Sequence, residues 1–309
     1  MAVTRLAHVE LFVPDLEAAR RFYVEMLGLI ETARDAQHLY LRATEEYEHH
    51  SLILTRAAGN GLAHMAFRVD DPNDLERLEG VYGRMGIRVR RIPTGAEVGQ
   101  GQAIRLRDPL GFPVEFYHRM ERVEPTLRSY AGVSPARLDH VNLRLPVPVD
   151  KGMRYYQEDL GFLVSEYALY SDGTTFGAWL HRKQTTHDVA LVHGPGTLIH
   201  HTAFYVPDVA SVVRTADILA DAGMRNCIEF GPGRHGITNA FFLYFRDPAD
   251  NRLEVFSGDY LIPDPDFAPR RWTHEEFEAN GRLLWGARPP QTMYEGQAVA
   301  DWADPPGPA

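Results

Sequence analysis

Leu138-Asp-His-Val-Asn-Leu-Arg-Leu145 is the stretch that decides the fold, because Leu6-Ala-His-Val-Glu-Leu-Phe-Val13 shows the same pattern 132 positions earlier. Each is an apolar run typical of a β-strand, and each carries a histidine at its third position. After the earlier run, Asp15 is placed to cap a helix over 16–27, and Gly28 ends that helix. A strand followed by a helix therefore opens each half of the chain.

Three further pairs of segments keep the same order in both halves. The segments 20–29, 64–69 and 107–115 are mirrored by 153–162, 201–206 and 246–254. Four matched landmarks in one order are strong evidence of an internal duplication. In the first half, strands are also predicted over 39–43, 51–55, 62–69, 88–92, 103–107 and 114–118, with a second helix over 73–85.

These patterns predict an α+β fold of two tandem domains, each a pair of βαβββ units (strand, helix, three strands) forming a curved mixed sheet. The N-terminal domain is expected over 1–132 and the C-terminal domain over 133–262. A proline-rich tail or lid follows over 263–309, where Thr273-His-Glu-Glu276 is a capping-box pattern that opens a short helix. The last six residues, Asp-Pro-Pro-Gly-Pro-Ala, are expected to be mobile.

The composition narrows the class of protein. The chain has 309 residues, 44% hydrophobic and 24% charged, as in a globular protein of two domains. No apolar run approaches the ~20 residues that span a bilayer, and the N-terminus lacks the apolar segment of a secretion signal. One cysteine, Cys227, excludes an intrachain disulfide framework and suits a reducing cytoplasm, and a net charge of −10 disfavours nucleic acid. We therefore expect a cytoplasmic protein without nucleic-acid or membrane partners.

Two histidines and a glutamate in the second half form a candidate metal site. His140, His201 and Glu254 fall on three different predicted strands of one domain, so their side chains can converge on one face of the sheet. Two imidazoles and one carboxylate make the facial triad of non-haem Fe(II) oxygenases, which leaves open positions on the metal. Each residue alone could be an isolated polar group, but equivalent positions in a repeated strand pattern favour metal ligation.

The repeated units resemble the vicinal oxygen chelate superfamily over nearly all of residues 5–260. Within it, Leu138-Asp-His-Val-Asn142, His201-Thr-Ala-Phe204 and Gly231-Pro-Gly-Arg-His-Gly-Ile-Thr-Asn-Ala-Phe-Phe-Leu-Tyr-Phe-Arg-Asp-Pro248 resemble type I extradiol dioxygenases of the homoprotocatechuate and catechol 2,3-dioxygenase branch, as does Leu284-Trp-Gly286. The resemblance implies extradiol (meta) cleavage of a catechol-type diol at a mononuclear non-haem Fe(II), with both atoms of O₂ inserted, in aromatic catabolism. It also implies a homotetramer. Mn(II) accepts the same ligands as Fe(II).

The resemblance also assigns roles around the metal. His187 matches the histidine that acts as general acid and base, a task for which imidazole is suited near neutral pH. His235 and Tyr244 match groups that hydrogen-bond a metal-bound catechol oxygen, and Asn142 and Trp179 match residues that line the O₂ and substrate side. Taken singly, each could instead be a surface histidine or an ordinary core residue.

The first domain repeats the triad as His8, His64 and Glu115, and His50 matches His187. The surrounding residues differ: constant offsets match His235 with Ala96, Tyr244 with Arg105, Asn142 with Glu10 and Trp179 with Arg42. An arginine and an extra glutamate do not serve catechol chelation. We therefore expect a metal-free relic in the first domain and one active site, in the second.

The substrate is expected to be a neutral or alkyl- or aryl-substituted catechol. In the homoprotocatechuate branch an arginine that holds the substrate carboxylate precedes the Gly-Pro-Gly-Arg-His segment, and Phe230 stands there in this chain, while Arg282 is expected to keep a second arginine. The alternatives are another metalloenzyme of the superfamily, either an isomerase or a hydroxyphenylpyruvate-type dioxygenase, and a non-catalytic small-molecule binding protein. His187, His235 and Tyr244 argue against the enzyme alternatives.

Overall fold

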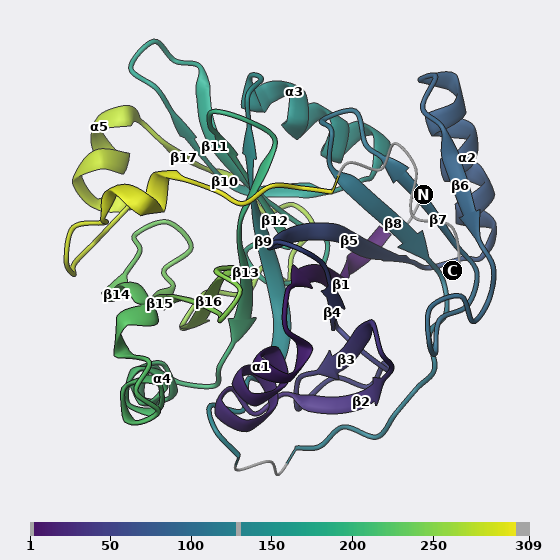
Figure 1. Cartoon of the computed structure of the whole chain (residues 1–309). Coiled ribbons are helices and arrows are strands. Elements are labelled where there is room, and N and C mark those ends of the chain that lie inside the picture. The colour runs from purple at the N-terminus through teal and green to yellow at the C-terminus, as the bar shows by residue number, and fades with distance from the viewer. Residues whose placement is uncertain (1–2, 128–130, 301–309) are drawn as a thin grey trace.

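The computed structural model describes residues 3–127 and 131–300, and each half of the sequence forms one mixed sheet (Figure 1). The first sheet has the strand order β2-β3-β4-β1-β5-β8-β7-β6. It contains β1 (Val3–Val13), α1 (Leu16–Arg20), β2 (Ile30–Arg34), β3 (His38–Arg42), β4 (Leu52–Arg56), β5 (Gly61–Val69), α2 (Asn73–Arg84), β6 (Val89–Ile92), β7 (Ala103–Arg107) and β8 (Pro113–Tyr117). This sequence of elements is two βαβββ units, as predicted. Strand β2 is the first of the three strands that follow α1, and the sequence patterns did not single it out.

The second sheet has the order β14-β15-β16-β13-β9-β12-β11-β10-β17. It contains β9 (Arg137–Leu145), α3 (Val149–Arg154), β10 (Leu163–Leu169), β11 (Thr175–His181), β12 (Val189–His193), β13 (Leu198–Tyr205), α4 (Val209–Asp221), β14 (Ile228–Arg234), β15 (Phe241–Arg246) and β16 (Arg252–Ser257). The tail adds β17 (Arg270–Trp272), which pairs in parallel with β10, and α5 (His274–Glu276). The predicted α+β fold of two tandem domains is confirmed.

Local sequence signals explain the ends of the helices. The Asp15 side chain accepts hydrogen bonds from the backbone N–H groups of Glu17 and Ala18 at 2.9 and 3.0 Å, as an N-cap does. The helix continues beyond α1 as a wider π-helical segment, η1 (Arg21–Met26), and Gly28 follows with φ +78°. Thr273 forms the predicted capping box with Glu276.

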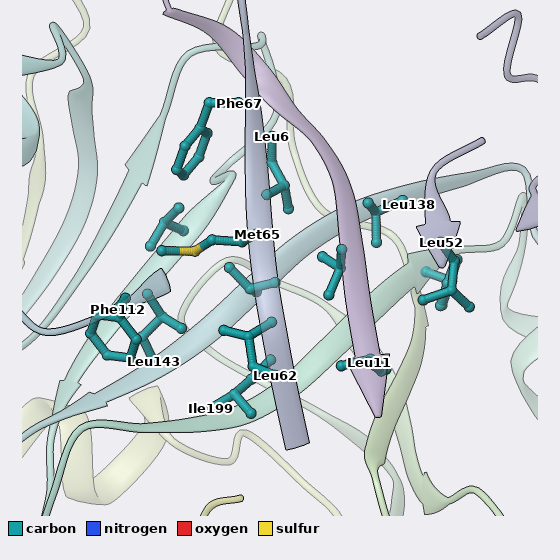
Figure 2. Packing of buried hydrophobic residues seen from close by; sticks show 14 of the residues in the cluster. Leu6, Leu11, Leu52, Leu62, Met65, Phe67, Phe112, Leu138, Leu143 and Ile199 are labelled. Carbon is teal, nitrogen blue, oxygen red and sulfur yellow. The ribbon is translucent and has the colours of Figure 1, made fainter. Parts of the chain in front are cut away.

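The two sheets share a hydrophobic core. Leu6 on β1 and Leu62 on β5 belong to the same buried cluster as Leu143 on β9 and Ile199 on β13, and all four are at most 3% exposed (Figure 2). Packing of these sheet faces fixes how the domains sit against each other. Figure 1 also shows α4 beside the strands β14–β16, which it contacts.

Beyond α5 the tail continues through η4 (Phe277–Gly281) and η5 (Gln291–Tyr294) and returns to both sheets. Isolated bridges join Gln297 to Ile199 in the second half and Val299 to Leu62 in the first half. The last six residues, which were expected to be mobile, lie outside the described residues. No helix in the described ranges is both long enough and apolar enough to cross a membrane.

Candidate metal centre and active site

The candidate ligands come from three neighbouring strands. Glu254 lies on β16, His201 on β13 and His140 on β9, and these strands are adjacent in the sheet. Ala203 is in register with both His140 and Glu254, so the alternation of side chains along the strands brings all three residues to one face. His201 lies inside β13, whose first residue is Leu198.

The three ligand atoms have the spacing of a facial set. Nε2 of His140 lies 3.3 Å from Nε2 of His201, and Oε2 of Glu254 lies 3.2 and 3.1 Å from these two nitrogens. Ligands about 2.0–2.2 Å from one ion at right angles to each other would lie roughly 2.8–3.1 Å apart. All three side chains are at most 3% exposed. The arrangement therefore fits a divalent metal with its other positions open.

The electrostatics favour the ligating forms of Glu254 and His201, whereas at His140 the lowering effect of burial is outweighed by hydrogen bonds with Asp139 and Glu254, which raise its pKa. Burial alone would raise the pKa of the Glu254 carboxyl, but the close imidazoles of His140 and His201 hold it well below its usual range. Burial lowers the pKa of His201 to about 4, against the opposing effect of Glu254. A carboxylate and a neutral imidazole are the forms that bind a metal.

One pocket opens onto this cluster. It is lined by all ten residues that the sequence analysis selected: His140, Asn142, Trp179, His187, His201, Phe230, His235, Tyr244, Glu254 and Arg282. The tail contributes Phe277, Met293 and Tyr294 to the wall. Tail residues thus form part of the pocket wall.

Two groups of polar side chains flank the metal position. His187 lies in the loop before β12, with its ring centroid 3.8 Å from that of His140 and its Nδ1 2.9 Å from Thr186 Oγ1. On the other side, Nε2 of His235 lies 3.2 Å from the Tyr244 hydroxyl, and its Nδ1 donates to the carbonyl oxygen of Arg282 at 2.6 Å. The pocket therefore has hydrogen-bonding groups on two sides of the metal position.

Among the pocket residues that sequence reasoning missed, two have basic side chains, Arg144 and His200. Arg144 follows His140 and Asn142 at alternate positions of β9, a period-2 signal that could have revealed it. Its Nη2 donates to the Met293 carbonyl at 3.0 Å, and among the described residues no carboxylate forms an ion pair with it and its Nε has no partner. His200 stands next to a predicted ligand, but no local pattern indicates where its side chain points.

The first domain assembles a similar cluster of histidines and glutamates, which also contains an arginine. Nε2 of His8 lies 2.9 Å from Nε2 of His64 and 3.6 Å from Glu115 Oε1, and Glu97 Oε1 lies 3.4 Å from His8 Nε2. The Arg105 guanidinium forms ion pairs with both Glu97 and Glu115. A cation from the chain itself thus already pairs with both carboxylates.

Strand register tests the matches between the halves. Arg105 lies opposite Glu115 as Tyr244 lies opposite Glu254, so the match between Tyr244 and Arg105 is confirmed. Glu10 likewise lies opposite His64 as Asn142 lies opposite His201.

Two other matches were wrong. Trp179 lies opposite Ala190, which in turn lies opposite Asn142. Tyr40 lies opposite Ile53, which in turn lies opposite Glu10. Trp179 therefore corresponds to Tyr40 and not to Arg42, because the two hairpins differ in length. The offset also matched His235 with Ala96, but the side chain in the cluster is that of Glu97. A constant offset fails wherever a loop has gained or lost residues.

The fold and site agree with comparisons to known proteins. Residues 5–116 and 137–255 match the Glyoxalase/Bleomycin resistance protein/Dioxygenase superfamily, and the chain belongs to this family. It is 36% identical to a manganese-dependent 2,3-dihydroxybiphenyl 1,2-dioxygenase of Geobacillus genomosp. 3, over 92% of this chain and 93% of the relative. It is 32% identical to a metapyrocatechase of Geobacillus stearothermophilus, over 94% and 92%.

A solved structure is also similar to this chain in fold and sequence. Homoprotocatechuate 2,3-dioxygenase from Arthrobacter globiformis superposes with a TM-score of 0.93 at 39% identity, covering 99% of this chain and 95% of that one. These relatives confirm the prediction of a catechol-type extradiol dioxygenase, an oxidoreductase.

Proposed function

We propose that the chain cleaves its diol at one metal centre, held by His140, His201 and Glu254 in the C-terminal domain. The mutual spacing of 3.1–3.3 Å between the three buried ligand atoms is the observation that carries this proposal. Bound Fe(II) or Mn(II) would supply a position that holds both diol oxygens and O₂ together. One relative is named as manganese-dependent, and the same ligand set serves either ion.

The remaining polar residues divide the proton chemistry between two sides of the site. His187 would take the proton of a substrate hydroxyl and later return it; burial lowers its pKa well below the usual value, so it is a neutral base near pH 7. His235 and Tyr244 would hydrogen-bond the other diol oxygen, where negative charge grows during the reaction. Burial raises the pKa of Tyr244 well above its usual range, so it acts as a donor.

The pocket walls support a substrate with a neutral alkyl or aryl substituent. The rings of Phe230 and Tyr244 are parallel within 11° at 5.9 Å, and Asn142 and Trp179 would line the O₂ and substrate side. Arg282 is already paired with Glu278 at 2.6 Å, so its charge is partly compensated. We therefore favour catechol and its alkyl or aryl derivatives over homoprotocatechuate.

Arg144 supports a second candidate, a catechol with a carboxylate side chain. Its guanidinium lines the same pocket without an ion-pair partner among the described residues, so it is the group that could receive that charge. The ratio of kcat/KM for homoprotocatechuate to that for 4-methylcatechol separates the candidates. A ratio well above one that falls tenfold or more in Arg144→Met would favour the carboxylate.

We further propose that residues 1–132 form a non-catalytic domain, 133–262 the catalytic domain and 263–309 a tail that helps to enclose the site. A homotetrameric enzyme in the cytoplasm is the assembly and location that we expect, and the single cysteine, Cys227, suits that compartment. Size-exclusion chromatography with light scattering tests the tetramer.

Anaerobic loading with Fe(II), followed by catechol and air, tests the function directly. We expect O₂ uptake and a yellow ring-opened product, both abolished in His201→Ala and retained in the matched first-domain variant His64→Ala. No O₂ uptake by the metal-loaded wild-type protein with any catechol would leave a binding protein as the better explanation.

A further inference from the structure

His200 connects a metal ligand to the end of the chain. Its Nδ1 lies 2.6 Å from Nδ1 of His201, and its Nε2 lies 2.8 Å from the carbonyl oxygen of Met293. His200 is 3% exposed, as is His201. The ring therefore bridges the far side of a metal ligand to the tail, away from the position where the metal would bind.

These two hydrogen bonds define which ring nitrogens carry protons. A carbonyl oxygen can only accept, so His200 donates to Met293 from Nε2. In the neutral ring of His200 the other nitrogen, Nδ1, then accepts, and His201 must donate to it from its own Nδ1. This tautomer leaves the lone pair on Nε2 of His201, which faces His140 and Glu254, as metal ligation requires.

The acceptor belongs to a well-anchored segment, residues 291–300, which we call the C-terminal strap. The side chain of Arg252, 1% exposed, donates to the carbonyl oxygens of Thr292 and Glu295 at 2.7 and 2.9 Å. Ile199 and Gln297 exchange two backbone hydrogen bonds of 3.0 and 2.7 Å. The Met293 carbonyl therefore stays in place only while the strap is docked against β13.

The first domain shows what a similar histidine pair looks like without these partners. Ala63 precedes His64 where His200 precedes His201, so this position holds no imidazole that could bridge His64 to another segment. Its Nδ1 lies 2.6 Å from a carboxylate oxygen of Glu10 instead.

The Nδ1 partner of the other histidine in each pair, His8 or His140, also differs between the two domains. Ala7 precedes His8, and Nδ1 of His8 has no hydrogen-bond partner within the described residues. In the second domain, Asp139 lies 3.4 Å from Nδ1 of His140. The duplicated halves therefore differ at the outer partners of both histidines and not at the histidines themselves.

We propose that His200 is a positioning residue that couples docking of the C-terminal strap to metal binding at His201. The inference rests on the proposed metal centre. Outer partners of ligating histidines typically contribute about 10–100-fold to metal affinity. Because coupling between two sites is reciprocal, the metal must in turn stabilise the docked strap by the same factor.

Metal affinity tests one direction of this coupling without any turnover. The full-length protein would be titrated with Mn(II) against a chelator, and His200→Leu is expected to weaken binding 10–100-fold. In His200→Gln the amide can still accept with its oxygen and donate with its nitrogen, so binding should stay close to that of the wild type. His193→Leu makes the same change at an exposed histidine of β12 and serves as the control.

Hydrogen exchange of the wild-type protein tests the other direction. The amide of Gln297 should exchange at least tenfold more slowly with Mn(II) than without it, and this difference should vanish in His200→Leu. Equal Mn(II) affinity in His200→Leu and the wild type, or a Gln297 amide insensitive to the metal, would overturn the inference. A wild-type protein that binds no Mn(II) would instead refute the proposed metal centre, whereas metal binding without ring cleavage would refute the proposed activity alone.

Discussion

Arg105→Leu removes the cation at the centre of the first-domain cluster. The Arg105 side chain is 16% exposed, and its partners Glu97 and Glu115 are 6% and 0% exposed. Breaking a buried ion pair by removing one partner costs about 3–5 kcal/mol, because the remaining charge is buried without compensation. Because the two sheets share a core, we expect the Tm of the whole protein to fall by about 5–8 °C.

A divalent metal should rescue this variant, since His8, His64, Glu97 and Glu115 would then surround a site with no resident cation. Metal at 100 times its Kd stabilises the folded state by about 2.7 kcal/mol, which would recover much of the loss. Thermal unfolding with and without Mn(II), together with metal analysis, measures both effects. We expect one metal per chain in the wild type and two in the variant.

Arg91→Leu is the matched control, because Arg91 forms an exposed ion pair with Glu79 and its loss should change the Tm little. Unfolding of Arg105→Leu at the wild-type temperature would contradict this role of Arg105. A wild-type protein that already carries two metals, one of them lost in His64→Ala, would contradict it as well.

Three further predictions concern the active site and the pH dependence of stability. His187→Asn should lower kcat by about 10²–10⁴-fold at unchanged metal content, since proton transfer and not metal binding is lost; a loss of metal would contradict this role. Tyr244→Phe should lower kcat by about 10²–10³-fold through loss of one donor to the diol oxygen, and stopped-flow turnover within threefold of the wild type would exclude that donation. Burial raises the pKa of Asp108 to about 7, above its value in the unfolded chain, so the folded state retains a proton that the unfolded chain releases. Stability should therefore decline as the pH rises from about 4 to about 7, and urea unfolding of Asp108→Asn should show a smaller decline than the wild type.

The duplication made much of this protein predictable. The repeated strand with its histidine and the matched segments after it led to two βαβββ pairs, which the sheets confirm. Strand β2 was missed because Ile30–Arg34 has little apolar alternation, and its residues are intermediate or exposed rather than buried. The structure brings all ten selected pocket residues together, because strand periodicity fixes the direction of most of their side chains.

The sequence by itself determined the duplicated architecture, the residues able to hold a metal and the class of enzyme. Only the tertiary structure decided what surrounds each histidine pair, because those partners come from loops, neighbouring strands and the distant tail. Glu97 and Arg105 meet in the first domain through ion pairs across a loop, and the Met293 carbonyl reaches His200 from 93 residues away. Such contacts depend on how separate segments pack, so no local pattern or constant offset encodes them.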